Sequence, residues 1–131
     1  MDRPIFDGGY SAEAESHLEG FHLDVVRKVA DAVSRDDVVV VGMAQNPHVG
    51  SARKALKGAG VAFTYLEFGS YFSQWKERLA IKMWSGWPTF PQVYVHGVLI
   101  GGSSRLRQAI ADGSFQERLE AGRETPASDA V

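Results

Sequence analysis

Apolar and polar positions along the chain predict alternating helices and strands. From Phe21 to Val33 the apolar residues recur at the spacing of one helical face, so we expect a first helix there, ending in the polar run 34–37. Val38 to Val41 then form an unbroken β-branched run, which is typical of a strand covered on both faces of a parallel or mixed sheet. This strand is therefore predicted to be central.

The next segment predicts a parallel crossover. A helix is expected from about His48 to Lys57, followed by a second strand from Val61 to Phe68 and a third helix from about Tyr71 to Trp84. Two consecutive strands joined by a helix imply a right-handed parallel connection.

The pattern changes after residue 86. Pro88 and Pro91 exclude a helix, because each proline removes a donor and pushes the preceding residue into extended geometry. Short strands are then predicted at 92–95 and 98–100, with the pair 96–97 as a tight hairpin turn. A helix capped by Ser103 or Ser104 should run to about residue 112, and a last one should cover 114–121.

This order predicts an α/β fold, a small sandwich around a four-stranded mixed sheet flanked by helices. Residues 1–20 are poor in large apolar side chains, so we expect a flexible or weakly helical N-terminal arm. The domain proper should occupy 21–121, and 122–131, rich in small residues, should be a disordered tail.

The composition of the chain excludes several classes of function. The 131 residues suffice for one domain, and the net charge of −2 gives no electrostatic footprint for nucleic acid or an anionic membrane surface. No apolar run is long enough to span a bilayer, and no secretory signal is visible, so a cytoplasmic location is expected. The absence of cysteine excludes a disulfide, a cysteine nucleophile, a CxxC couple and any site built on protein thiolates. The histidines at 17, 22, 48 and 96 lack metal-ligand spacing, so no metal site is predicted.

One segment resembles a known family. The run 87–97 reads WPTFPQVYVHG, a Gly-Gly pair follows at 101–102, and Arg78 and Lys82 stand upstream. Together with the order of elements, these motifs resemble the glutaredoxin family over roughly residues 21–121, most closely its monothiol, CGFS-type branch. The resemblance implies a thioredoxin-like three-layer sandwich.

The resemblance fails where the family carries its cysteines. An ungapped alignment puts Asn46 at the nucleophilic cysteine and Val49 at the resolving one, whereas a three-residue gap puts Val49 at the nucleophile. Neither register supplies a thiol, and the lysine usual before the cysteine is absent near Met43. Since thiol–disulfide exchange needs a thiolate, catalysis of that kind is excluded. The protein's share in holding a [2Fe–2S] cluster is lost as well, although His48 remains a less favoured imidazole ligand.

The part of the family site that holds glutathione is retained in sequence. The resemblance implies that Pro91 is the family's cis-proline, with the backbone of Phe90 turned toward an extended ligand. Arg78 and Lys82, four apart on one helical face, would bind a glutathione carboxylate, although a solvated basic face explains them about equally well. The candidate set for the other carboxylate is Gly102, Ser103 and Ser104, which would offer backbone amides at a helix start. Relatives usually carry Asp at the position of Ser104, so this end should be weakened.

Six aromatic residues lie close together in the sequence. We expect most of them to be core residues, with Trp87 and Phe90 partly exposed beside the groove. The six are Tyr71, Phe72, Trp75, Trp84, Trp87 and Phe90.

Three functional hypotheses remain open. The favoured one is a redox-inactive, cysteine-less glutaredoxin-like protein with a groove for glutathione or an extended peptide and a binding or regulatory role. The second is an interaction scaffold in which the arm or the aromatic segment contacts a protein partner or forms a homodimer. The third is a residual glutathione-dependent oxidoreductase, which ranks last because Asn46 cannot replace a nucleophile.

Overall fold

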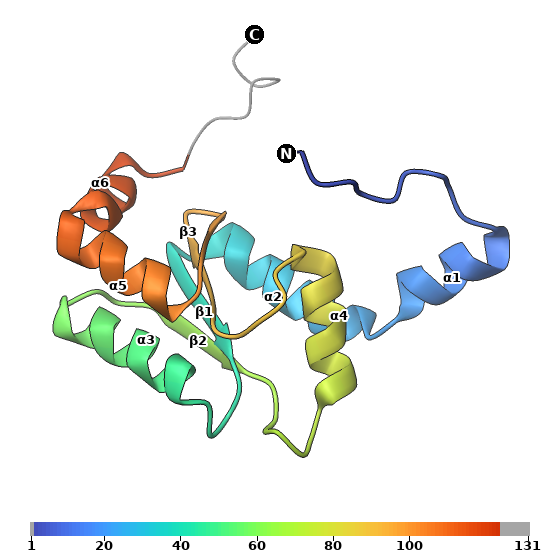
Figure 1. Ribbon diagram of the computed structural model, residues 1–131, viewed down its shortest axis with the longest axis horizontal. Coiled ribbons are helices and arrows are strands. Elements are labelled where there is room, and N and C mark those ends of the chain that lie inside the picture. Colours follow the sequence, from blue (N-terminus) through green and yellow to red (C-terminus); the bar gives the residue numbers. More distant parts are fainter. Residues whose placement is uncertain (1, 124–131) are drawn as a thin grey trace, which may run out of the picture.

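The structure, a computed structural model that describes residues 2–123, is a four-stranded mixed sheet with helices on both faces (Figure 1). The strands β1 (Val38–Gly42), β2 (Thr64–Glu67), β3 (Gln92–Val95) and β4 (Val98–Gly101) lie in the order β2-β1-β3-β4. β1 pairs in parallel with β2 and antiparallel with β3, and β3 pairs antiparallel with β4. The predicted fold, with a central first strand, a crossover and a hairpin, is confirmed.

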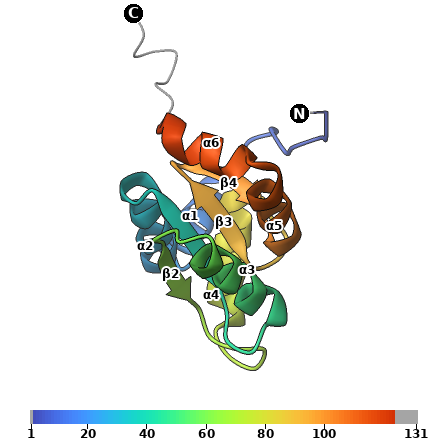
Figure 2. The same ribbon diagram turned by 90° about the vertical axis from the view of Figure 1, so that its left-hand side faces the viewer.

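The helices form two layers around this sheet (Figures 1 and 2). α2 (Leu23–Arg35) and α4 (Trp75–Ser85) pack together on one face. α3 (Pro47–Gly58), α5 (Ser103–Asp112) and α6 (Ser114–Ala121) cover the other. The remaining helix of the described residues, α1 (Ala12–Gly20), lies outside both layers and has no buried residue.

The core follows from the alternation of side chains along β1. Val39 and Val41 belong to the cluster between the sheet and α2 and α4, while Val38 and Val40 belong to the cluster beneath α3, α5 and α6. All four valines are at most 2% exposed. Burying both faces of one strand requires the continuous apolar run that the sequence shows.

Two predicted elements are shorter than expected. β2 covers Thr64–Glu67 rather than 61–68, and α4 begins at Trp75 rather than at Tyr71. The loop before α4 is held by serine side chains, since Ser70 N–H donates to Ser73 Oγ at 3.0 Å and Phe72 N–H donates to Ser70 Oγ at 3.3 Å. Such local side-chain bonds compete with helical hydrogen bonds, which explains the late start.

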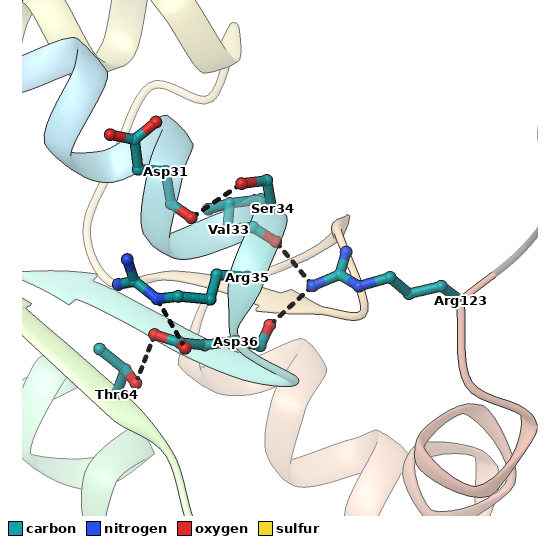
Figure 3. Close-up of polar contacts among 7 residues, drawn as sticks. All are labelled: Asp31, Val33, Ser34, Arg35, Asp36, Thr64 and Arg123. Atoms are coloured by element: carbon teal, nitrogen blue, oxygen red, sulfur yellow. Dashed lines mark hydrogen bonds and ion pairs between the residues drawn. The ribbon is translucent and has the colours of Figure 1, made fainter.

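The C-terminal end of the described chain is tied to the domain. Arg123 Nη2 donates to the carbonyls of Val33 and Asp36, both at 3.0 Å (Figure 3). The Asp36 carboxylate in turn accepts from Arg35 Nε and Thr64 Oγ1, and these bonds hold the pKa of Asp36 below its usual value. Of the predicted tail, residues 122–123 belong to the described part of the chain and 124–131 lie outside it.

A search for membrane-spanning helices among residues 2–123 finds none with the necessary length and apolar character.

Candidate functional site

Asn46 forms the N-cap of α3. Its side-chain Oδ1 accepts hydrogen bonds from the backbone N–H groups of His48 at 2.9 Å and Val49 at 3.4 Å. Its backbone is extended, with φ −92° and ψ 114°, and Pro47 follows as the first helical residue. Asparagine is a preferred cap and proline is tolerated at that next position because no intrahelical partner awaits its nitrogen. The amides at this helix start therefore have a partner supplied by the chain itself.

Val49 is packed beneath the same helix start. Its side chain is 2% exposed and lies against the end of β1, where a Cβ added to Gly42 would be 2.7 Å from Val49 Cγ1. The glycine is thus required for the close approach of α3 to the sheet. In the ungapped alignment, the two positions of the family cysteines are occupied by a helix cap and a core residue.

Arg78 lies inside the protein. The residue is 7% exposed, and its Nη1 donates to the carbonyls of Phe68, at 2.9 Å, and Ser73. It therefore fixes the loop between β2 and α4. Spacing on α4 puts Arg78 and Lys82 one turn apart, but the guanidinium is directed to backbone carbonyls of its own chain.

Lys82 lies close to the segment that precedes β3. Its Nζ is 5.6 Å from the centroid of the Phe90 ring, within the range of a cation–π contact. The Phe90–Pro91 peptide bond is cis. Among residues 2–123, neither the N–H nor the C=O of Phe90 has a backbone hydrogen-bond partner. The expected exposure of Phe90 is wrong, because the residue is only 7% exposed and belongs to the core cluster. Trp87 is half-buried, as expected.

The buried side-chain amide of Gln92 holds the segment 87–91 by a hydrogen bond. Gln92 is fully buried, and its Nε2 donates to the carbonyl of Trp87 at 3.1 Å. Its Oε1 accepts from the hydroxyl of Tyr94 at 2.8 Å, and burial raises the pKa of that hydroxyl to about 12. Gln92 was read only as a strand residue from the sequence. Its position directly after the proline is the signal that could have identified it as a support for the 87–91 segment.

The start of α5 faces the same segment and is uncapped. Gly102, not a serine, is its N-cap, and no side chain caps the helix. A Cβ added to Gly102 would be 3.5 Å from the carbonyl oxygen of Pro91, an ordinary contact distance. Ser103 is 5% exposed, and its Oγ has no hydrogen-bond partner among the described residues, whereas Ser104 is exposed. The structure therefore brings Gly102, the residue before Ser103, beside Pro91.

Most of the clustered aromatic residues are exposed, contrary to the prediction that they form core. Tyr71 and Phe72 lie in the loop before α4, and Trp75 and Trp84 lie on α4, which belongs to an outer layer of the domain. The exposed fractions are 56% for Tyr71, 94% for Phe72, 60% for Trp75 and 41% for Trp84.

A hollow of about 770 Å³ lies elsewhere, between β4, α5 and α6. Its walls include Ile100, Arg105, Phe115 and Arg118, and none of the candidate glutathione-binding residues lines it. Within 2–123, no group of three or more histidine and acidic side chains is arranged to hold a metal ion.

Comparison with known proteins gives a consistent relationship. The sequence model of the Glutaredoxin family matches residues 38–100. A glutaredoxin-like protein of Dictyostelium discoideum is 48% identical over 103 residues, which cover 79% of this chain and 84% of the relative. A probable monothiol glutaredoxin of Legionella pneumophila is 32% identical over 81 residues, covering 60% of this chain and 88% of that protein.

Solved structures agree on the fold. The crystal structure of a buckwheat glutaredoxin–glutathione complex matches with a TM-score of 0.67 at 20% identity, over 79% of this chain and 94% of that one. Oxidized glutaredoxin 2 from Chlamydomonas reinhardtii matches with a TM-score of 0.66 at 20% identity, over 76% and 94% of the two chains.

Proposed function

Because this chain belongs to the glutaredoxin family and contains no cysteine, we propose that it is a redox-inactive member that binds glutathione or an extended peptide. The observation that carries the proposal is the contrast between a closed and an open helix start. Asn46 occupies the amides at the start of α3, whereas Gly102 leaves the start of α5 free of any side-chain cap.

The proposed redox inactivity rests on the absence of a thiolate at the start of α3. An amide oxygen that accepts two backbone N–H groups cannot attack sulfur, and an alkyl side chain such as Val49 cannot either. The N-terminus of a helix favours a thiolate by the same donors that Asn46 uses here. The cap thus replaces the nucleophile while preserving the helix.

The binding groove is supported by three groups that lie around Pro91. Lys82 offers an ammonium for one carboxylate of the ligand, and the free backbone N–H and C=O of Phe90 could pair with an extended peptide. The start of α5, with Gly102 and Ser103, offers amides to the second carboxylate. Arg78 contributes by holding the loop that precedes α4 rather than by contacting the ligand. Glutathione is also the ligand in the buckwheat complex of the same fold.

Glutathione titration followed by NMR tests the groove. We expect chemical-shift changes at Lys82, Phe90 and Ser103, and about tenfold weaker binding in Lys82→Ala, because a charge-assisted hydrogen bond is lost. Lys57→Ala, which removes an exposed lysine from α3, should leave binding unchanged. No shift at millimolar glutathione, or equal effects of both substitutions, would overturn the groove.

A standard glutaredoxin assay on the purified protein tests the redox part separately. We expect no turnover with glutathione and a disulfide substrate, since the chain supplies no thiolate. Turnover by the pure protein would instead support a residual glutathione-dependent oxidoreductase. The same preparation should lack the visible absorbance of an iron–sulfur cluster. We also propose that the protein is located in the cytoplasm.

A second candidate function is an interaction scaffold. The observation that favours it is the set of exposed aromatic side chains on and before α4, since contiguous exposed apolar surface marks interaction sites.

A further inference from the structure

The outer face of α4 carries an uncovered apolar stripe. Trp75, Leu79 and Met83 are four residues apart, so they share one face of the helix, and Phe72 precedes them in the loop. Their exposed fractions are 60%, 39%, 50% and 94% respectively. We call these four residues the α4 stripe. Large apolar side chains at such exposure, aligned along one helix, form a surface that a partner can bury.

The N-terminal arm, residues 2–20, also carries apolar side chains that are exposed to solvent. α1 is nine residues long and buries no side chain, although isolated helices below about twelve residues are marginal in water. Ahead of it, the rings of Phe6 and Tyr10 pack on each other at 5.3 Å, yet 65% and 55% of these residues remain exposed. Ile5 beside them is 68% exposed. The arm is thus structured locally, but no other part of residues 2–123 buries it.

The two surfaces have opposite charge. The arm contains five carboxylates, at 2, 7, 13, 15 and 19, and a single arginine, Arg3. Next to the α4 stripe, Lys76 is exposed and its Nζ is 5.7 Å from the Trp75 ring centroid. The neighbouring helix α2 carries two further exposed basic residues, Arg27 and Lys28. Complementary charge of this kind speeds association and fixes orientation.

We propose that the arm of one copy of this chain docks on the α4 stripe of a second copy, with the same contact made in return. The arm leaves its own α4 stripe exposed, so the surface that it matches in apolar character and charge is available on another molecule. A reciprocal exchange gives two identical contacts and closed two-fold symmetry, which prevents growth into a filament. The α4 stripe is therefore covered by the arm of a second copy. In this contact the Phe6 and Tyr10 rings pack on the apolar residues of the stripe, and the carboxylates of the arm face its basic neighbours.

Sedimentation equilibrium of the full chain over a wide concentration range tests the dimer. We expect the native chain to dimerise and the dissociation constant to rise about tenfold or more in Phe72→Asp/Trp75→Glu and in Phe6→Asp/Tyr10→Asp, because buried aromatic residues dominate interface energies. Val98→Glu, which changes an exposed apolar residue on β4, is the matched control and should leave dimerisation unchanged. A monomer at every concentration, or a dimer that either double substitution leaves intact, would overturn the proposal.

Two further measurements identify which surfaces meet. A mixture of the arm variant and the stripe variant should associate more tightly than either variant alone, since one intact arm then binds one intact stripe. A contact between two stripes would leave that mixture monomeric and would contradict the proposal. Lys76→Glu, which keeps every apolar residue, should weaken the dimer and make it less sensitive to salt; unchanged affinity and salt dependence would count against the charge match.

Discussion

The N-termini of α3 and α5 differ in whether a side chain accepts hydrogen bonds from their first backbone N–H groups. At α3 the side chain of Asn46 accepts from two N–H groups, at 2.9 and 3.4 Å. At α5 the capping residue is Gly102, which has no side chain, and the neighbouring Ser103 Oγ is buried without a partner among residues 2–123.

This difference separates two uses of the same structural feature. A helix start attracts anions because its N–H groups are unsatisfied and its dipole is positive there. A chain that satisfies those groups itself gains stability and loses the site, whereas a chain that leaves them open keeps the site. Here the closed start is the one at which the family carries its thiolate, and the open start is the one that we propose for a carboxylate.

The largest effect is expected from the packing that holds the start of α3. In Gly42→Ala the new Cβ would be 2.7 Å from Val49 Cγ1 and 3.1 Å from the Tyr65 ring, so we expect a loss of about 2 kcal/mol of unfolding free energy in urea denaturation. Adding Val49→Ala should recover part of this loss. The control is Gly50→Ala in α3, next to Val49, where an added Cβ would meet no atom within 4 Å. This change should be neutral or stabilising. Equal losses at both glycines would mean that the close approach is not the cause.

A thiol placed at the closed start tests whether that position still favours an anion. In Asn46→Cys the amides of His48 and Val49 become available to the sulfur, so we expect a thiol pKa about one unit below the value of ~8.5 for free cysteine. The absence of a lysine near Met43 should keep the shift this small. Thiolate absorbance against pH measures it, with Lys54→Cys in the exposed middle of α3 as control. A pKa no lower than that of the control would show that the start of α3 has lost its anion preference.

Removal of the cap should have a smaller effect on stability. Asn46→Ala leaves two N–H groups without their acceptor, and we expect a loss of about 1 kcal/mol, measured by thermal or urea unfolding. Asn46→Asp should retain the stability because a carboxylate is an equally good cap. Ser104→Ala at the start of α5 should change nothing, since Ser104 is exposed and caps nothing. A loss at Ser104 as large as at Asn46 would remove the contrast between the two helices.

The smallest change in stability is expected when the open start is closed. Gly102→Asn supplies a cap at a backbone of φ −99°, which asparagine adopts freely, so a gain of a few tenths of a kcal/mol should result. The same change should abolish the glutathione-induced shift at Ser103, because the amides are then occupied. Gly102→Ala adds a Cβ without an acceptor and should leave that shift in place. Persistence of the shift in Gly102→Asn would place the ligand elsewhere.

Much of the fold could be predicted from the sequence because its signals are local. The β-branched run at 38–41 indicated a strand buried on both faces, and the pair 96–97 indicated a hairpin, whose residues have φ of 47° and 82°. The boundaries of α4 could not be predicted, since they depend on hydrogen bonds between serine side chains and the loop backbone. The exposure of the aromatic residues could not be predicted either, for a different reason: apolar character does not reveal whether another layer covers a residue.

The sequence by itself determined that this protein has no thiol and that its segment 87–102 carries the family's motif. Only the tertiary structure decided the use of the remaining groups. Arg78 and Lys82 are indistinguishable in spacing, yet the guanidinium bonds to the carbonyls of Phe68 and Ser73 while the ammonium lies over Phe90. The physical reason is that spacing fixes the face of a helix, whereas the acceptors that face meets are brought there by distant parts of the chain.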